Sequence, residues 1–208
     1  MKRHLSFQTI RKRIASAPHG SAFVAGDFTD VASNAAANEA LLRLLRLGDV
    51  RRVLHGVYEK PWYNDFLRET IKPEPDEIAK ALARKFNWTI APCGDAALNL
   101  LGLSSQVPTV WTYVSTGPYR TYEMEGATLR FKHAANKEFV SPLEKSNRVV
   151  QALKALGERC VDAASVAGFR RSLGKEDRER LLADSQYTTG WIRAAIQSIC
   201  KESSTCVT

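Results

Sequence analysis

Asparagines at positions 34 and 38 are the first residues whose type and spacing indicate a chemistry. If this segment is helical, the two side chains lie one above the other, because residues four apart share a face. An asparagine amide can donate and accept together, and so can pair with the edge of adenine in the DNA major groove. The neighbouring Ala35 and Ala36 would keep the helix thin enough to approach bases. The alternative is a solvated helix face, since asparagine is common near helix N-termini.

Basic residues follow the asparagine pair, and they could hold the phosphates of a nucleic acid. Arg43 and Arg46 come later in the same segment, and Arg51 and Arg52 come directly after it. An arginine pair in a turn is also typical of an ordinary soluble loop. With a helix cap and a histidine added, the predicted DNA-contacting residues are Ser33, Asn34, Ala35, Asn38, Arg43, Arg46, Arg51, Arg52 and His55.

The segment that would position these residues runs from Phe23 to Tyr58. Ser33 suits a helix N-cap, because its hydroxyl can accept from a backbone N–H in the first turn. Gly48 suits the left-handed residue that closes a helix. Between them an apolar stripe at helical spacing must face a core. Its members are Ala37, Ala40, Leu41, Leu44, Leu45 and Leu47.

The elements on either side complete a recognisable order. We expect a short helix over 23–28, a turn over 29–33, the helix over 34–47 and a hairpin over 50–58 with its bend at Gly56. A helix-turn-helix followed by a wing is a device that reads DNA.

Residues 5–17 predict a first, amphipathic helix. Phe7, Ile10 and Ile14 fall on one face, while the basic residues 11–13 lie largely off it. The basic side could touch the DNA backbone, although a solvated face is the preferred interpretation.

Charge is concentrated in the same region. The chain has 208 residues, 44% of them apolar, and a formal net charge of +8. Residues 1–60 hold 10 Lys and Arg against 5 Asp and Glu, and the remaining 148 hold 20 against 17. This excess favours a polyanionic partner, and RNA or an anionic membrane would satisfy it as well as DNA.

The compartment and the enzymatic potential follow from what the pattern lacks. We expect no membrane span and no signal peptide, because no long apolar run is present. Four cysteines without a CxxC pair indicate free thiols in a reducing cytoplasm. No nucleophile elbow, phosphate loop or HExxH pattern occurs, so we expect no catalytic residues, no metal and no cofactor. Cys93 at a helix start could be an activated thiol, but a buried structural cysteine is the preferred interpretation. The acids at 65, 69, 74 and 76 could form a nuclease-like metal site, but a solvated acidic linker is preferred.

The predicted fold class is α+β, with an N-terminal winged helix-turn-helix over 1–68 and a mixed α+β domain over 77–208. The spacer around Pro73 and Pro75 separates them. We expect a small antiparallel sheet from strands at 88–91, 107–116, 119–125 and 127–134. We expect helices at 77–86 capped by Asp76, at 96–101, from a Ser141 capping box with Pro142 to 156, and at 161–171, 175–183 and 189–200.

The strands interleave aromatic and basic residues, which leaves open a nucleic-acid-acting enzyme or effector that the winged helix targets to DNA. A sheet with one packed and one solvated face is the preferred interpretation. The residues concerned are Tyr113, Tyr119, Arg120, Tyr122, Arg130, Lys132 and His133. A separate alternative, which does not rest on these strands, is a protein-interaction module in which the winged helix binds a protein.

Two stretches together resemble the AbiEi-type antitoxins, winged-helix regulators of type IV toxin–antitoxin systems. They are FVAGDFTDVASNAAANEALLRLLRLGDVRRVLHGVY and PCGDAALNLLGLSSQVPTVWTYVSTG. The resemblance covers residues 5 to about 155 and rests on the order of loose motifs, and it leaves residues 160–208 unassigned.

The resemblance implies a winged helix that binds operator repeats in its own promoter, and a C-terminal domain needed for antitoxicity without enzymatic activity. Its implied DNA contacts are Asn34, Asn38, Arg43, Arg51 and Arg52. The implied counterpart is a nucleotidyltransferase-like toxin that forms no stable complex with the antitoxin. Palindromic sites would need two copies of the helix about 34 Å apart, so we expect a dimer or paired binding.

Overall fold

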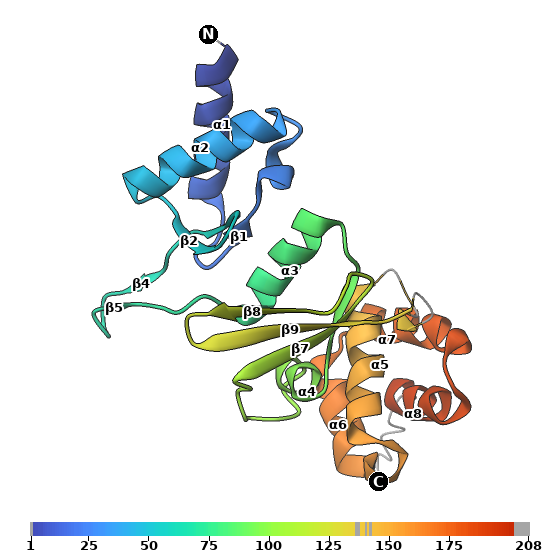
Figure 1. Cartoon of the computed structure of the whole chain (residues 1–208). Helices are drawn as coiled ribbons and strands as arrows, with labels where there is room; N and C mark the ends of the chain where they lie inside the picture. Colours follow the sequence, from blue (N-terminus) through green and yellow to red (C-terminus); the bar gives the residue numbers. More distant parts are fainter. Residues whose placement is uncertain (1, 136–137, 140, 142, 202–208) are drawn as a thin grey trace. The chain divides into compact units, whose positions relative to one another are not determined.

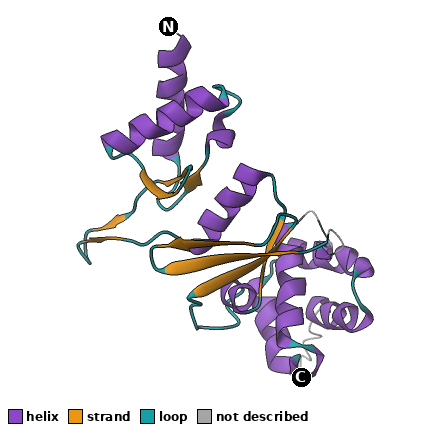
Figure 2. Ribbon diagram, in the orientation of Figure 1, coloured by secondary structure: helices purple, strands orange, loops and turns teal. Residues whose placement is uncertain are grey.

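A computed structural model describes residues 2–135, 138–139, 141 and 143–201 of the chain (Figure 1). The chain divides into two compact units. The first comprises Met1–Ile90 with Thr121–Leu129, and the second comprises Ala91–Arg120 with Arg130–Thr208. Both helices and strands occur in each unit (Figure 2), so the class is mixed α+β with small antiparallel sheets, as predicted.

The first unit begins with a helix, a short strand, a 3₁₀ turn, a second helix and a hairpin. These elements are α1 (Lys2–Ser16), β1 (Ala22–Phe23), η1 (Ala25–Phe28), α2 (Asn34–Leu47), β2 (Arg51–Leu54) and β3 (Val57–Glu59). The three strands form one antiparallel sheet in the order β1-β3-β2. Phe23 was predicted to be helical, but it pairs with Tyr58 in this sheet, and the helical turn starts two residues later.

The predicted helix over 34–47 is confirmed with its two ends. The Ser33 hydroxyl accepts from the Ala36 N–H at 3.3 Å, and Gly48 adopts the left-handed φ of 78° that closes the helix. Ala37, Ala40, Leu41 and Leu44 are buried against residues of α1, η1 and β3 in one apolar cluster. The cluster includes Phe7, Ile10 and Ile14, as predicted for α1. Leu47 was predicted to be part of the stripe but is 53% exposed. It is the last residue of α2 and lies beyond Leu44, the last buried residue of the helix.

Residues 60–74, between the predicted wing and the next predicted helix, contain a short hairpin, and the helix predicted over 77–86 is confirmed. A two-stranded hairpin, β4 (Tyr63–Asn64) with β5 (Glu69–Thr70), extends away from the three-stranded sheet (Figure 1). The helix α3 (Pro75–Phe86) then packs against β1, η1 and β3. Its N-cap is Glu74 with Pro75 at the first position. The predicted cap, Asp76, lies inside the helix, where it is buried and pairs with Lys80 at 2.9 Å.

The helix α3 belongs to the first unit, so the chain divides elsewhere than at the boundary predicted between 68 and 77. The Arg84 guanidinium donates to the Asp27 carboxylate at 2.8 Å and to the Ala22 carbonyl at 2.8 Å. The Lys85 ammonium donates to the carbonyl of His55 in the β2–β3 turn. The prolines extend the chain locally, but the apolar face and the cations of α3 bring it back onto the sheet.

Among the described residues, a four-stranded sheet and five α-helices make up most of the remaining chain. The sheet has the order β6-β7-β9-β8, and the tip of the β8–β9 hairpin is grouped with the first unit. Its strands are β6 (Ile90–Cys93), β7 (Val110–Ser115), β8 (Arg120–Met124) and β9 (Ala127–His133). The described helices and 3₁₀ turns here are α4 (Asp95–Leu100), α5 (Glu144–Leu156), η3 (Glu158–Cys160), α6 (Ala163–Ser172), α7 (Lys175–Asp184), η4 (Ser185–Tyr187) and α8 (Gly190–Cys200).

These elements match the sequence-based expectations within a few residues, with two differences. The strand predicted over 88–91 lies at 90–93. Ser141 does not cap α5: its hydroxyl accepts from the N–H of Leu143, which is itself the N-cap residue, and Pro142 lies outside the described residues. The helices close around an apolar cluster that includes Leu153, Phe169, Leu181 and Ile196. Within the described part of the chain, every helix is too short or too polar to cross a bilayer.

Candidate functional site

The outward face of α2 carries most of the predicted site residues. Asn34, Ala35, Asn38, Arg43 and Arg46 are all exposed, and Ala35 and Arg46 lie opposite the buried alanines and leucines. Because successive helical residues are about 100° apart, the centre of this face is formed by Ala35, Glu39, Leu42 and Arg46. Asn38 lies on its border, and Asn34, seven residues before the buried Leu41, is exposed in the first turn but lies nearer the buried side.

The sequence-based prediction missed Glu39 and Leu42, which are exposed at the centre of the same face. Leu42 is 40% exposed, although its neighbour Leu41 is fully buried. A helical wheel based on the predicted apolar stripe would have identified both residues, because they lie on the side of the helix opposite that stripe. A carboxylate can accept from the cytosine N4 amine, and an apolar side chain can contact the thymine methyl group, so both types are compatible with base contact.

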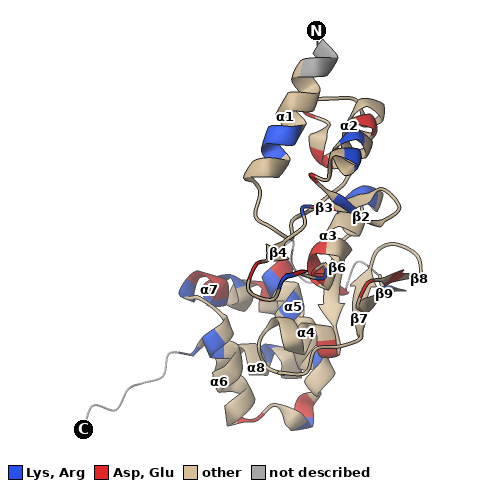
Figure 3. Cartoon of the chain, turned by 90° about the vertical axis from the view of Figure 1, so that its left-hand side faces the viewer, with Lys and Arg blue, Asp and Glu red and all other residues tan. Residues whose placement is uncertain are grey.

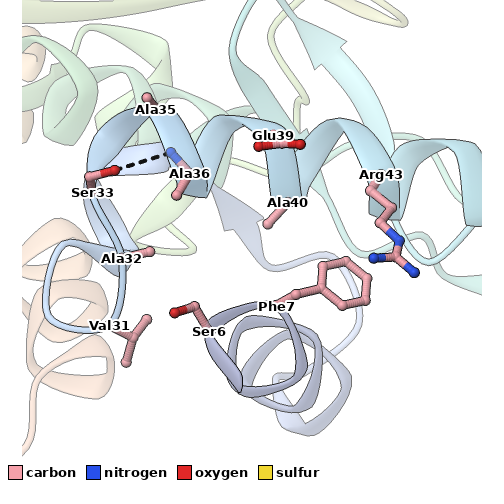
Figure 4. Close-up of a pocket in the computed structure, with 10 residues that line it drawn as sticks. All are labelled: Ser6, Phe7, Val31, Ala32, Ser33, Ala35, Ala36, Glu39, Ala40 and Arg43. Carbon is pink, nitrogen blue, oxygen red and sulfur yellow. Dashed lines mark hydrogen bonds between the residues drawn. The ribbon is translucent and has the colours of Figure 1, made fainter. Parts of the chain in front are cut away.

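A groove of about 580 Å³ runs beside the N-terminal half of α2 (Figure 4). Its lining residues come from the start of α1, the turn before α2, and one side of α2. They are Ser6, Phe7, Val31, Ala32, Ser33, Ala35, Ala36, Glu39, Ala40 and Arg43. The groove thus brings together three of the predicted site residues, Ser33, Ala35 and Arg43, and Asn34 and Asn38 are not among its lining residues.

Arg43 is held against α1 by an aromatic ring. Its guanidinium carbon lies 4.2 Å from the centroid of the Phe7 ring (Figure 4). A cation over an aromatic face is attracted by the ring quadrupole, and such a contact restricts the long side chain. Arg43 therefore presents its charge at the edge of the groove from a defined position.

Arg51 was predicted to hold phosphate, but its guanidinium is engaged inside the unit. Its guanidinium is largely buried, with the side chain 25% exposed, and it donates from Nε to Glu59 at 2.5 Å and from Nη2 to the Ile71 carbonyl at 2.5 Å. The Glu59 carboxylate is 1% exposed, and burial raises its pKa even though Arg51 opposes that shift. Arg51 is thus committed to an internal ion pair that joins β2 and β3 to the segment after β5.

Arg52 and His55 keep the exposure that the prediction required. Arg52 points away from Arg51, as neighbours on a strand do, and His55 lies in the β2–β3 turn. Gly56 closes this turn with a φ of 69°, and a Cβ atom there would lie 2.9 Å from the Lys85 ammonium. The turn is therefore positioned by α3 as well as by its own strands.

The basic residues of α1 are partly neutralised. Arg11 pairs with Asp49 at 2.7 Å, and Arg13 pairs with Asp30 at 2.6 Å. The Arg13 hydrogen bond lowers the pKa of Asp30. Figure 3 shows Lys and Arg on α1, α2 and β2, accompanied by fewer acidic residues. Exposed Lys12 and Arg46 therefore add net positive charge to a region in which other cations are already paired.

The other candidates from the sequence do not converge on a catalytic centre among the described residues. Tyr113 is fully buried and stacks on Phe131 at 5.6 Å, whereas Tyr119 is 73% exposed beside His133. Desolvation raises the pKa of Cys93, which is opposite to the activation of a thiol.

No group of three His, Cys, Asp or Glu residues that could hold a metal occurs in the part of the chain that the structure describes.

Comparison with known proteins identifies a family and gives no named relative. No curated protein and no solved structure matches the chain. One family model, a family of unknown function (DUF6088), matches residues 9–181, which include α2 and the strands β1 to β9. Because this match covers most of the chain, the protein belongs to the DUF6088 family of unknown function.

Proposed function

We propose that residues 2–59 form a winged helix-turn-helix that binds double-stranded DNA, with α2 in the major groove. The order of helix, strand, helical turn, helix and hairpin supports this proposal, as does the β1-β3-β2 order of the sheet. In this arrangement η1 and α2 are the helix-turn-helix pair, and β2 and β3 form the wing. The second helix of such a pair contacts base edges, and the wing contacts the backbone.

The single observation that carries the proposal is the division of α2 into two faces. Ala37, Ala40, Leu41 and Leu44 bury one face in the core of the unit, so α2 has a fixed orientation. The opposite face presents short side chains at the first turn and arginines further along. A helix anchored in this way can enter a groove 12 Å wide without unfolding, and its first turn is thin enough to approach bases.

We further propose that the protein regulates its own operon and serves as the antitoxin of a type IV toxin–antitoxin system. The resemblance of residues 5–155 to AbiEi-type antitoxins is the basis of this step. The DNA ligand would be operator repeats in its own promoter. The functional counterpart would be a nucleotidyltransferase-like toxin that forms no stable complex with this chain, and both proteins would act in the cytoplasm.

The rival proposal is an enzyme or effector that acts on nucleic acid and is targeted by the winged helix. Its basis was the aromatic and basic strand residues. Tyr113, the first aromatic residue of that pattern, is buried and so is not offered for stacking on a base, whereas Tyr119 is exposed. The regulator is therefore the better supported of the two.

Fluorescence anisotropy with the DNA upstream of the gene tests the proposal. We expect binding at nanomolar to micromolar concentrations, and weaker binding to an unrelated duplex of the same length. Asn34→Ala with Asn38→Ala should lose about 1–3 kcal/mol per base contact on the upstream DNA and little on the unrelated duplex. Ser105→Ala with Gln106→Ala, an exposed pair in the other unit, is the matched control.

Two results would count against the proposal. Equal affinity for both duplexes would remove sequence recognition, and unchanged affinity of the double asparagine variant would remove the asparagines from the interface. For the antitoxin step, growth rescue from a co-expressed nucleotidyltransferase-like toxin by the full-length chain would support the proposal, and absence of rescue would count against it.

A further inference from the structure

Glu39 is an exposed carboxylate near the centre of the outward face of α2. A glutamate four residues before a basic residue on a helix ordinarily pairs with it. Arg43 occupies that position, but its guanidinium lies over the Phe7 ring, 4.2 Å from the centroid and away from the Glu39 carboxylate (Figure 4). Among the described residues, no side chain forms an ion pair or a hydrogen bond with Glu39. The carboxylate can therefore accept hydrogen bonds from a ligand.

The helix dipole does not account for an acidic residue at this position. Acidic side chains stabilise the first turn of a helix, where they face the positive end of the dipole, and the effect falls off beyond that turn. The helix α2 begins at Asn34, so Glu39 lies in its second turn. The two common structural reasons for a glutamate on a helix thus do not apply to Glu39.

The Glu39 side chain reaches over the first turn of α2. A helical side chain leans toward the N-terminus and covers the turn that precedes it. The residues four and three positions before Glu39 are Ala35 and Ala36, whose side chains end at Cβ. The carboxylate therefore extends over the part of α2 that, under the proposed function, contacts base edges.

The four bases differ in what they offer a carboxylate in the major groove. Guanine and thymine present acceptors, which repel it, and adenine presents its N6 amine beside the N7 acceptor. Cytosine presents the N4 amine as a donor, with no acceptor on the same base. A carboxylate that loses water without gaining a donor is costly, so Glu39 would disfavour the bases that leave it unpaired.

We propose that Glu39 is a specificity-determining residue of α2, which selects cytosine by accepting a hydrogen bond from the N4 amine. This inference rests on the proposed function and deepens it, because it names a base that α2 requires. Arg43 and Arg46 follow on the next turns of the helix and supply positive charge. That charge offsets the repulsion between the Glu39 carboxylate and the DNA phosphates.

Selection by the full chain from a pool of duplexes with randomised centres tests the proposal. The wild type should enrich a site with a required cytosine. Glu39→Gln should enrich adenine at that position, because a glutamine amide pairs with adenine N6 and N7. Glu179→Gln, at an exposed glutamate of α7, makes the same change in charge and should enrich the wild-type site. Urea unfolding should show that both variants are folded.

A modified base identifies the atom that is read. In N4-methylcytosine a methyl group replaces the major-groove N–H, and the remaining N–H still pairs with guanine. Placed at the selected cytosine, it should lower the affinity of the wild type about tenfold. The affinity of Glu39→Ala should change by less than about twofold, because that variant has no carboxylate to lose the bond. The same methyl group at a cytosine outside the selected site is the control and should leave the wild-type affinity unchanged.

Three outcomes would overturn the inference and leave DNA binding by α2 intact. They are a wild-type site without a required cytosine, enrichment of the same site by the wild type and Glu39→Gln, and equal effects of N4-methylcytosine on the wild type and Glu39→Ala. A wild type that enriches no site would instead remove the proposed function, and the assignment of cytosine with it.

Discussion

Arg51 donates a hydrogen bond from Nε to the buried carboxylate of Glu59 at 2.5 Å, across the two strands of the β2–β3 hairpin. The same guanidinium reaches the carbonyl of Ile71 and lies 4.0 Å from Glu125 at the tip of the β8–β9 hairpin. A pair of adjacent arginines in the sequence is therefore divided in the fold. Arg51 acts inside the unit, and Arg52 is left at its surface.

Substitution of the two arginines should separate stability from binding. Arg51→Ala leaves the Glu59 carboxylate buried without its partner, and we expect the free energy of unfolding to fall by about 2–4 kcal/mol. Arg52→Ala removes an exposed cation and should change it by less than about 0.5 kcal/mol. Urea unfolding measures both. Equal stability of the two variants would contradict the internal role of Arg51.

Glu59 should make stability depend on pH in a defined direction. Its pKa is raised by burial, so the folded state holds the proton more tightly than the unfolded state. As pH rises from the ordinary glutamate pKa of about 4.3 through the folded value, unfolding releases a proton and stability falls. Below the ordinary pKa this penalty is absent.

The variant Glu59→Gln isolates that effect, because the carboxylates whose pKa is lowered, such as Asp30, are common to both proteins and cancel. The wild type should lose stability relative to Glu59→Gln across this range of pH and then keep a constant difference. Unfolding curves between pH 4 and pH 8 (about one unit apart) measure the difference. A difference that grows in favour of the wild type would show that Arg51 outweighs burial.

Salt dependence should distinguish cations that contact phosphate. If Arg46 and Arg52 each hold one phosphate, Arg46→Ala and Arg52→Ala should each reduce the slope of log affinity against log salt by about 0.9. The loss of affinity should be similar on upstream and unrelated DNA. Arg159→Ala, at an exposed arginine of η3, serves as the control and should keep the wild-type slope.

Steric access to α2 gives a test that leaves charge and hydrogen bonding unchanged. Ala35 is exposed at the centre of the outward face, and leucine is almost as good a helix former as alanine. Ala35→Leu should therefore preserve stability but weaken DNA binding by about tenfold or more, because it thickens the turn that must approach bases. Ala155→Leu, at an exposed alanine of α5, controls for added apolar surface. Full affinity of Ala35→Leu would exclude close approach at this turn.

Local sequence signals were sufficient for much of this fold. The bounds of α2 follow from a side-chain cap at Ser33 and a left-handed glycine at 48, which act within one turn of the residues they define. The strand alternation that predicted β7, β8 and β9 is equally local, since each strand has one packed face.

The misplaced features depend on residues far apart in the chain. The role of Arg51 depends on Glu59 and Ile71, and the grouping of α3 with the first unit depends on Asp27, 57 residues before Arg84. The residues predicted to contact DNA from α2 are displaced from the centre of its outward face for a different reason. Asparagines were chosen for their hydrogen-bonding chemistry, whereas the buried stripe fixes which residues stand outermost.

The hydrogen bond from Lys85 to the His55 carbonyl limits where the chain can be truncated without disturbing the first unit. A fragment ending at residue 68 loses α3, and with it the ammonium that braces the hairpin turn at Gly56. Extending the fragment to residue 90 still omits residues 121–129, whose Gly126 lies close against the Lys72 side chain. No single truncation therefore isolates the first unit intact. Expression of that unit alone requires a designed chain in which a short linker replaces residues 91–120 and joins residue 90 to residue 121.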